Sequence, residues 1–291
     1  MTSFRERLAS GTIVGDGGWG MALVARGLRL GAPPELWTLT RPDTLAEIVR
    51  MYVHAGAEVI TTNTFGGSPM RLAQHQLDSE LEEINGRAVD IALAASEGKA
   101  YVSASMGPTG RLLAPLGDAD PAEVAAGFEQ QARVLAEAGA DLFCIETMID
   151  LQEAVLAVRA ARAAGPGMPI IATLTFETTP RGAFTVMGAS VPAAVAALAD
   201  AGADAVGANC GQGVEEMVAI ARELLASTKL PVVVQPNAGL PTLAQGTLVY
   251  PTTPERFAEL LAPLAAEGVR LIGGCCGTTP EHIRALRERI G

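Results

Sequence analysis

Three of the four cysteines in this chain of 291 residues lie in short glycine-rich segments. Cys210 is followed by a glycine, and the neighbours Cys275 and Cys276 have glycines on both sides. Three thiolates form a soft ligand set that suits zinc, and they leave the fourth position of a tetrahedral site open. An open position distinguishes a catalytic zinc ion from a structural one. The sequence therefore predicts a catalytic Zn²⁺ ion held by Cys210, Cys275 and Cys276.

The adjacent pair of cysteines places a condition on this prediction. Neighbouring residues of a strand point to opposite faces, so Cys275 and Cys276 reach one metal ion only if the backbone turns there. The glycines around the pair, Gly273, Gly274 and Gly277, provide conformational freedom for such a turn. Two unrelated core residues and a vicinal disulfide are the alternatives for the pair. A third cysteine in a similar segment favours zinc over both.

Two carboxylates indicate which charged group the substrate carries. A site of three thiolates and Zn²⁺ has a net charge of about −1, so it polarises carbonyls poorly but can bind and deprotonate a substrate thiol. The bound sulfur can then attack an electrophilic carbon. Asp16 and Glu146 each follow an apolar run, where they could bind an ammonium group through charge-assisted hydrogen bonds. A thiol with an ammonium group is an amino thiol.

Other catalytic residue types are poorly placed. The two lysines, Lys99 and Lys229, each stand just before a predicted strand, which disfavours a Schiff-base enzyme. The three histidines, His54, His75 and His282, fall in predicted helices or a loop, and we interpret them as surface or packing residues. Cys144 lies on a predicted strand two residues before the glutamate, and we expect it in the core.

A repeated phrase predicts the elements that position these residues. In each copy a predicted helix ends at a glycine, and a short apolar run typical of a buried strand follows. The predicted strands lie near residues 12–17, 58–64, 100–105, 141–147, 169–175, 204–209, 231–236 and 269–274. The predicted helices lie near residues 44–55, 80–97, 121–138, 150–164, 191–201, 214–227, 254–267 and 279–290.

Eight strand–helix units in strict alternation predict an α/β fold, a single-domain (β/α)₈ TIM barrel over residues 1–291. A doubly wound sheet is the alternative. The longest irregular segments are expected at 18–43 and 106–120. Catalytic residues of such barrels lie at the carboxyl ends of the strands, which is where the cysteines and both carboxylates fall.

Composition and charge exclude several classes of protein. Hydrophobic residues make up 49% of the chain, enough for a full core. The net charge of −11 disfavours nucleic acid and membrane surfaces as partners. No apolar run has the roughly 18 residues of a membrane span. With no signal-like start and only four cysteines, we expect a cytoplasmic protein.

The motifs together resemble those of the homocysteine S-methyltransferase family. That family includes the homocysteine-binding module of cobalamin-dependent methionine synthase and short bacterial betaine–homocysteine methyltransferases. The resemblance covers essentially the whole chain. It rests on Gly207-Ala-Asn209-Cys210, Gly273-Gly-Cys-Cys-Gly-Thr278, Asp16-Gly17, Thr62-Asn-Thr-Phe-Gly66, Gly107-Pro-Thr-Gly110, Glu146-Thr147 and Pro236-Asn-Ala-Gly239.

The resemblance implies transfer of a methyl group to zinc-bound L-homocysteine, which gives methionine. It assigns the metal to the three cysteines, with Asn237 as a fourth ligand in the substrate-free state. Asp16 and Glu146 would bind the ammonium group of homocysteine, and backbone amides around Gly17 and Gly18 its carboxylate. Ser105 and Asn209 would line the pocket.

The methyl donor is open at this stage. The resemblance implies betaine, S-methylmethionine or a methylcorrinoid, and the last requires a separate carrier protein. The animal-type betaine enzyme has a tyrosine where this chain has Thr147, whereas short bacterial betaine enzymes share Pro34-Glu-Leu-Trp37. Trp19 and Trp37 are donor-side candidates, because aromatic faces can enclose a quaternary ammonium or sulfonium group.

Three further functions stay open from the sequence. The same zinc chemistry could act on another thiol or in a corrinoid-linked demethylase. The chain could instead be a homocysteine-binding module that is active only with a partner protein. A phosphate-binding barrel enzyme with a structural zinc ion is the third possibility.

Overall fold

Eight parallel strands form a closed barrel in the computed structural model, which describes residues 2–244 and 247–291. The order around the sheet is β1-β12-β9-β8-β5-β4-β3-β2, and a bridge between Gly15 and Val59 joins its two ends. The predicted (β/α)₈ barrel is therefore confirmed, and the doubly wound alternative is wrong. The barrel strands are β1 (Ile13–Val14), β2 (Val59–Thr61), β3 (Tyr101–Met106), β4 (Leu142–Met148), β5 (Ile170–Leu174), β8 (Ala205–Cys210), β9 (Val232–Pro236) and β12 (Val269–Ile272).

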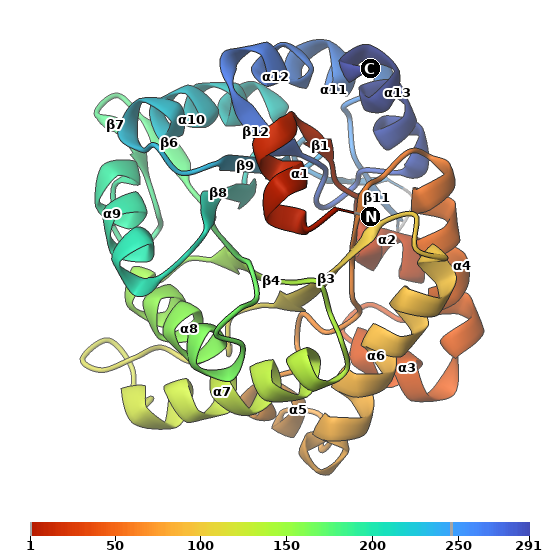
Figure 1. The fold of residues 1–291 in the computed structure, drawn as a ribbon, viewed down its shortest axis with the longest axis vertical. Coiled ribbons are helices and arrows are strands. Elements are labelled where there is room, and N and C mark those ends of the chain that lie inside the picture. Colours follow the sequence, from red (N-terminus) through yellow and green to blue (C-terminus); the bar gives the residue numbers. More distant parts are fainter. Residues whose placement is uncertain (1, 245–246) are drawn as a thin grey trace.

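A ring of helices surrounds the strands (Figure 1). The helix predicted over 254–267 is two helices, because Pro263 has no N–H to donate and starts a new one. The helices of the ring are α4 (Pro42–His54), α6 (Leu81–Ser96), α7 (Pro121–Glu137), α8 (Leu151–Ala164), α9 (Val191–Ala201), α10 (Val214–Ser227), α11 (Pro254–Leu261), α12 (Pro263–Glu267) and α13 (Pro280–Ile290).

The chain holds more elements than the eight predicted units, although the barrel strands still alternate with the helices of the ring as predicted. The segment 18–43, expected to be irregular, contains three short helices. These extra elements are too short to give a periodic pattern. They are α2 (Trp19–Val24), η1 (Pro34–Leu36), α3 (Trp37–Thr40), α5 (Pro69–Ala73), η2 (Asp78–Glu80) and the hairpins β6 (Glu177–Thr179)–β7 (Gly182–Phe184) and β10 (Thr242–Ala244)–β11 (Thr247–Val249).

A further helix, α1 (Phe4–Ser10), precedes the first strand and lies across one end of the barrel (Figure 1). Its Phe4 and Leu8 are buried among the first residues of the strands, such as Tyr101. Its Arg7 forms an ion pair with Glu58, with Nη2 and Oε2 2.8 Å apart. Helix α1 therefore closes the amino end of the barrel and leaves the carboxyl ends of the strands free.

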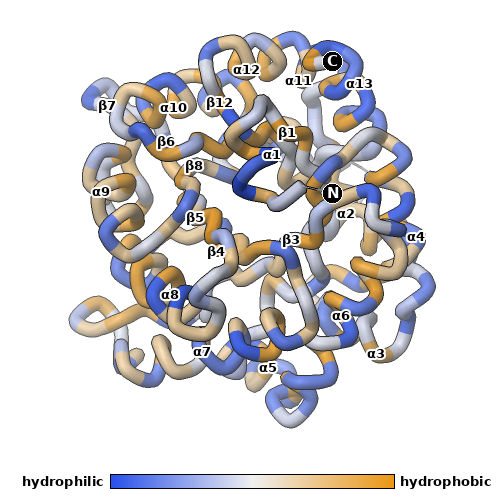
Figure 2. Tube along the Cα trace, viewed as in Figure 1, coloured by the Kyte–Doolittle hydropathy of each residue, from blue (hydrophilic) through white to orange (hydrophobic). Residues whose placement is uncertain are grey.

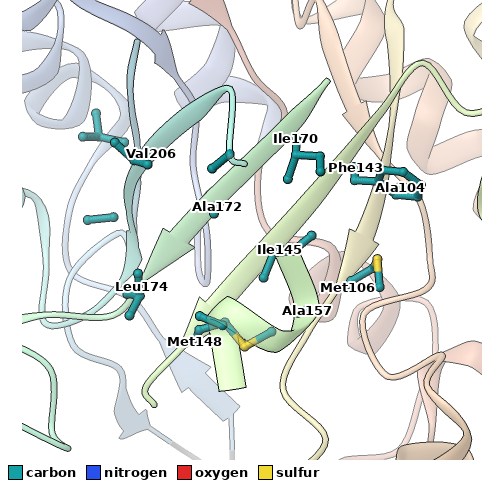
Figure 3. Close-up of a cluster of buried hydrophobic side chains, with 14 of the residues drawn as sticks. Ala104, Met106, Phe143, Ile145, Met148, Ala157, Ile170, Ala172, Leu174 and Val206 are labelled. Atoms are coloured by element: carbon teal, nitrogen blue, oxygen red, sulfur yellow. The ribbon is translucent and has the colours of Figure 1, made fainter. Parts of the chain in front are cut away.

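The main core lies between the strands and the helices. Figure 3 shows Phe143, Ile145 and Ala172 of the strands beside Ala157 of α8, and all four are fully buried. Figure 2 shows apolar strands inside helices of mixed hydropathy, as expected of parallel strands that are buried on both faces. Among the described residues, no helix has the length and apolar character needed to cross a membrane.

Candidate metal and substrate site

A cavity of about 490 Å³ lies at the carboxyl ends of the strands. The loops after β1, β2 and β12 and the last residues of β3, β4, β8 and β9 line it. The predicted site residues among those that line it are Asp16, Gly17, Gly18, Trp19, Ser105, Glu146, Cys210, Cys275 and Cys276. The structure therefore brings the candidate metal ligands and both carboxylates into one cavity.

The three predicted cysteine ligands form a cluster. The Sγ atoms of Cys210, Cys275 and Cys276 all lie within 4.8 Å of one another. The chain leaves the strand geometry after Ile272, and Gly277 adopts a φ of 80°, which favours glycine. This irregular turn is the one that the adjacent cysteines require.

At the other glycines of the site, neighbouring atoms lie so close that a Cβ atom would not fit. This lack of space explains the glycines better than a need for flexible backbone does. Gly273 and Gly274 have no positive φ, but a Cβ atom on Gly274 would collide with the side chain of Thr278. A Cβ atom on Gly18 would lie 2.8 Å from the carbonyl oxygen of Cys275. The expectation of conformational freedom is therefore correct for Gly277 and wrong for Gly273 and Gly274.

The thiols shift one another's pKa values. Hydrogen bonds from the thiols of Cys275 and Cys276 lower the pKa of Cys210. The same pairing with Cys210 raises the pKa of Cys275 well above its ordinary value and that of Cys276 to about 11. Ionising all three sulfurs together thus requires a positive charge among them. Three converging sulfur donors fit a thiophilic divalent cation such as Zn²⁺.

Three hydrogen bonds fix the carboxylate of Asp16 in the cavity. Its carboxylate accepts hydrogen bonds from the backbone N–H of Thr61 (2.8 Å), the hydroxyl of Thr61 (2.9 Å) and the indole N–H of Trp19 (2.9 Å). Only 2% of the residue is exposed, and this burial raises the pKa of Asp16 to about 6 despite the three hydrogen bonds.

Glu146 is the second carboxylate, and its neighbours fix its position. The hydroxyl of Ser105 donates to one carboxylate oxygen, and the amide of Asn209 donates to the other over 3.4 Å. Burial raises the pKa of Glu146 to about 7. The next residue, Thr147, has a φ of 60°, and Cys210 has a φ of 62°. Such strained backbone is common at functional sites.

Two residues predicted to belong to the pocket, Asn209 and Asn237, hold the backbone of the site in place through hydrogen bonds. Asn209 does not line the cavity; its Oδ1 accepts from the backbone N–H of Thr147 (2.7 Å) and the hydroxyl of Thr173 (2.9 Å). Asn237 accepts from the backbone N–H of Cys276 (3.0 Å) and donates to the carbonyl of Gly211 (2.6 Å). Asn237 thus connects the two cysteine loops, and its role as a fourth ligand stays a prediction.

The glycines predicted to bind a carboxylate differ in their amides. The N–H of Gly18 donates to the hydroxyl of Thr278 (2.9 Å) and to its carbonyl (3.1 Å). The N–H of Gly17 has no hydrogen-bond partner among the described residues. The expectation for the Gly18 amide is therefore wrong in this structure, and Gly17 stays a candidate.

The two tryptophans, Trp19 and Trp37, lie in different environments. Trp19 lines the cavity beside Asp16, whereas Trp37 is only 8% exposed and belongs to the main core. The guanidinium of Arg41 stacks over the ring of Trp37, 4.8 Å from its centroid. The expectation that Trp37 faces the methyl donor is wrong, because its helix turns the ring inward.

Comparison with known proteins identifies the family of this chain. A family model described as homocysteine S-methyltransferase matches residues 13–290. The chain belongs to the homocysteine S-methyltransferase family. Membership in this family confirms the resemblance seen in the motifs.

Relatives in this family differ in length. The methionine synthases of Mycobacterium leprae (strain TN) and Mycobacterium tuberculosis are each 37% identical over 306 aligned positions. These alignments cover 99% of this chain but only 25% of each relative, so the chain spans a quarter of their length.

A solved structure of a family member has the same fold over nearly its full length. The homocysteine methyltransferase MmuM from Escherichia coli, in its metallated form, is 28% identical with a TM-score of 0.79. The alignment covers 96% of both chains. The apo form of that enzyme gives a TM-score of 0.76.

Sequence reasoning missed several residues that line the cavity. The ring of Tyr250 lies against Gly277, where a Cβ atom would collide with it. Glu35, Arg71 and His75 also line the cavity. Tyr250 follows the hairpin β10–β11 and the others lie in or near short helices, which the strand-end rule does not cover. Glu35 lies in a segment that the resemblance to bacterial betaine enzymes singled out.

Proposed function

We propose that the protein transfers a methyl group to the sulfur of L-homocysteine, which gives methionine, and that this transfer depends on Zn²⁺. The convergence of three thiols and the carboxylates of Asp16 and Glu146 in one cavity carries the proposal. Membership in the homocysteine S-methyltransferase family supports it.

Cys210, Cys275 and Cys276 would hold the metal ion. When bound, Zn²⁺ would supply the positive charge that keeps a substrate thiol ionised at neutral pH. Asn237 fixes the spacing of the two loops that carry these cysteines, through its hydrogen bonds to Cys276 and Gly211. Such support of metal ligands by a further layer of hydrogen bonds is typical of metal sites.

The two carboxylates bind the amino group of homocysteine in this proposal. Asp16 and Glu146 lie in one cavity with the cysteines, and each is oriented by hydrogen bonds that leave lone pairs free. The positive charge of an ammonium group beside the two carboxylates would favour their ionised forms, and it would therefore lower the pKa of both Asp16 and Glu146. The amide of Gly17, which has no hydrogen-bond partner in the described part of the chain, is the candidate for the substrate carboxylate.

The cavity volume fits two small substrates together. A volume of about 490 Å³ exceeds the need of one amino acid, so a donor can approach the sulfur while homocysteine is bound. In the transfer a carbon–sulfur bond forms, and the bond between the methyl carbon and the donor atom breaks with its electron pair left on the donor. Holding both reactants in line is the main contribution of the protein.

Betaine, S-methylmethionine and a methylcorrinoid on a partner protein are the candidate donors. The first two bring an activated methyl group as small molecules. The third would need a separate protein, and relatives four times as long as this chain have room for such a carrier within one polypeptide.

An isotope assay tests the proposal. Purified protein with Zn²⁺ and homocysteine is offered each donor with a labelled methyl group, and labelled methionine is measured. We expect labelled methionine with one of the three donors and none with Cys275→Ser. No product with any donor would contradict the proposal, and full activity in Cys275→Ser would indicate a structural metal.

A further inference from the structure

Tyr52 is a buried polar side chain that the proposed function does not use. It lies on α4, where it is fully buried and belongs to the main core. Its hydroxyl donates to the carbonyl oxygens of Gly18 (3.1 Å) and Thr278 (3.3 Å). Gly18 belongs to the loop after β1, and Thr278 belongs to the loop after β12. One side chain of an outer helix is therefore hydrogen-bonded to both loops.

Thr278 completes the connection between the two loops. Its hydroxyl accepts from the backbone N–H of Gly18 (2.9 Å) and donates to the carbonyl of Cys275 (2.6 Å). A Cβ atom on Gly17 would lie 2.8 Å from Thr278 Oγ1 and 3.0 Å from Tyr52 Cε1, so the loop after β1 packs directly on both side chains. We call Tyr52 and Thr278 together the loop brace.

The two loops carry groups that would bind opposite ends of the substrate. Asp16 and Gly17, on the loop after β1, are the proposed partners of the ammonium and carboxylate groups of homocysteine. Cys275 and Cys276, on the loop after β12, are two of the proposed ligands of the metal ion that would bind the substrate sulfur. The spacing of the loops therefore sets the distance that a bound amino thiol must span between its ammonium group and its sulfur.

We propose that Tyr52 and Thr278 are positioning residues that make the site selective for the length of the amino thiol. This inference rests on the proposed binding of homocysteine and deepens it. Neither side chain lines the cavity, so both act through the loops that they connect. Cysteine has the same functional groups as homocysteine but is one methylene shorter. A fixed spacing favours one of the two lengths, whereas loops that can shift would accept both.

Binding of the two amino thiols tests the inference without a methyl donor. Titration calorimetry on reduced, zinc-loaded protein measures the dissociation constants of homocysteine and cysteine, and their ratio is the selectivity. We expect wild type to prefer homocysteine by about tenfold or more, as is typical for one methylene. Tyr52→Phe removes one hydroxyl and keeps the ring, and it should lower the selectivity about threefold to tenfold because two buried carbonyls lose a donor.

Three further variants locate the effect. Thr278→Val removes the other hydroxyl of the loop brace and should also lower the selectivity, whereas Thr278→Ser keeps a hydroxyl and should retain most of it. Tyr101→Phe is the matched control for Tyr52→Phe. The hydroxyl of Tyr101 donates to the carbonyl of Thr2 (2.8 Å) at the amino end of the barrel, so its loss should leave the selectivity unchanged. Circular dichroism and zinc content confirm that each variant is folded and loaded.

The outcomes separate this inference from the proposed function. An unchanged selectivity in Tyr52→Phe, or an equal loss in Tyr101→Phe, overturns the inference, and so does a wild type that binds both amino thiols equally. If Tyr52→Phe does not fold, the selectivity of Thr278→Val decides in the same way. These results leave methyl transfer untouched, because labelled methionine tests it separately. A loss confined to the loop brace, together with no methionine from any donor, supports the inference and contradicts the methyl transfer.

Discussion

Glu146 shows at the level of one residue how function and stability oppose each other. Its carboxylate lines the cavity, and partial burial raises its pKa to about 7. Asp16 faces the same cavity with a pKa of about 6. A protein selected for stability alone would avoid two such groups in one cavity, whereas an ammonium-binding site needs them.

The first prediction concerns the pH dependence of substrate binding. Both carboxyls must be ionised to bind an ammonium group, and the protonated fraction of each grows as the pH falls through about 7 for Glu146 and about 6 for Asp16. We therefore expect the KM for homocysteine to rise between pH 8 and pH 5.5. Steady-state kinetics on protein with verified zinc content measures this rise. A KM that stays constant over the range would contradict it.

The second prediction concerns the stability of Glu146→Gln without substrate. The folded pKa of Glu146 lies above the ordinary value of 4.5, so its contribution to stability is complete below pH 4.5 and is lost as the pH rises through about 7. At pH 8 the variant should be more stable than wild type by about 1–3 kcal/mol, and near pH 4 the gain should vanish. Urea unfolding at both pH values measures the difference. A variant less stable than wild type at pH 8 would argue against a burial cost.

The predicted residues that the structure places in the cavity share one property. Cys210, Glu146 and Asp16 each directly follow an apolar strand pattern, and the carboxyl ends of barrel strands meet at one rim. Trp37 and Asn209 were misplaced because the direction of a side chain depends on tertiary packing. Arg71 could not be found, because nothing in its local sequence shows that α5 borders the cavity.

At the scale of the elements, the loop after β1 packs tightly against the loop after β12. Gly18 donates its N–H to Thr278 and leaves no space for a Cβ atom beside Cys275. The positions of Cys275 and Cys276, two of the proposed zinc ligands, therefore depend on a glycine more than 250 residues away in the sequence.

The third prediction tests this contact between the two loops. Gly18→Ala should displace the loop of Cys275 and weaken zinc binding by about 10- to 100-fold, as expected for residues that support metal ligands. Gly20→Ala is a matched control, since no atom lies within 4 Å of its added Cβ. Competition with a chromogenic chelator measures the affinities. Equal zinc affinity in both variants would show that the loops do not depend on each other.

The apolar pattern around an element, and not its length alone, decided whether it could be predicted. The ring helices and all eight barrel strands, including β1 with two residues and β2 with three, had periodic or apolar patterns that could be recognised. The three-residue strands of β6, β7, β10 and β11 did not, and they form hairpins through contacts that only the folded chain provides. The helix break at Pro263 is visible in the sequence, because proline disfavours the interior of a helix.

At the scale of the whole molecule, stability and chemistry occupy opposite ends of the barrel. Helix α1 seals the amino end through Phe4 and Leu8, while the cavity opens at the carboxyl end. This division is typical of (β/α)₈ enzymes and lets loops vary without loss of the core.

The fourth prediction follows from this division. Leu8 is 3% exposed, and Leu8→Ala should lower the free energy of unfolding by about 2–4 kcal/mol through lost burial and a cavity. The zinc affinity and the KM for homocysteine should stay unchanged below the unfolding temperature. Chemical denaturation and the chelator competition measure the two effects. A loss of zinc affinity in the folded variant would show that the two ends are coupled.

X-ray absorption at the zinc edge tests the central claim most directly, because it counts the sulfur atoms bound to the metal. We expect three sulfur ligands from Cys210, Cys275 and Cys276 in reduced protein, and a fourth sulfur when homocysteine is added. A zinc ion whose sulfur count does not change on addition of homocysteine, or reduced protein that binds no zinc, would contradict it.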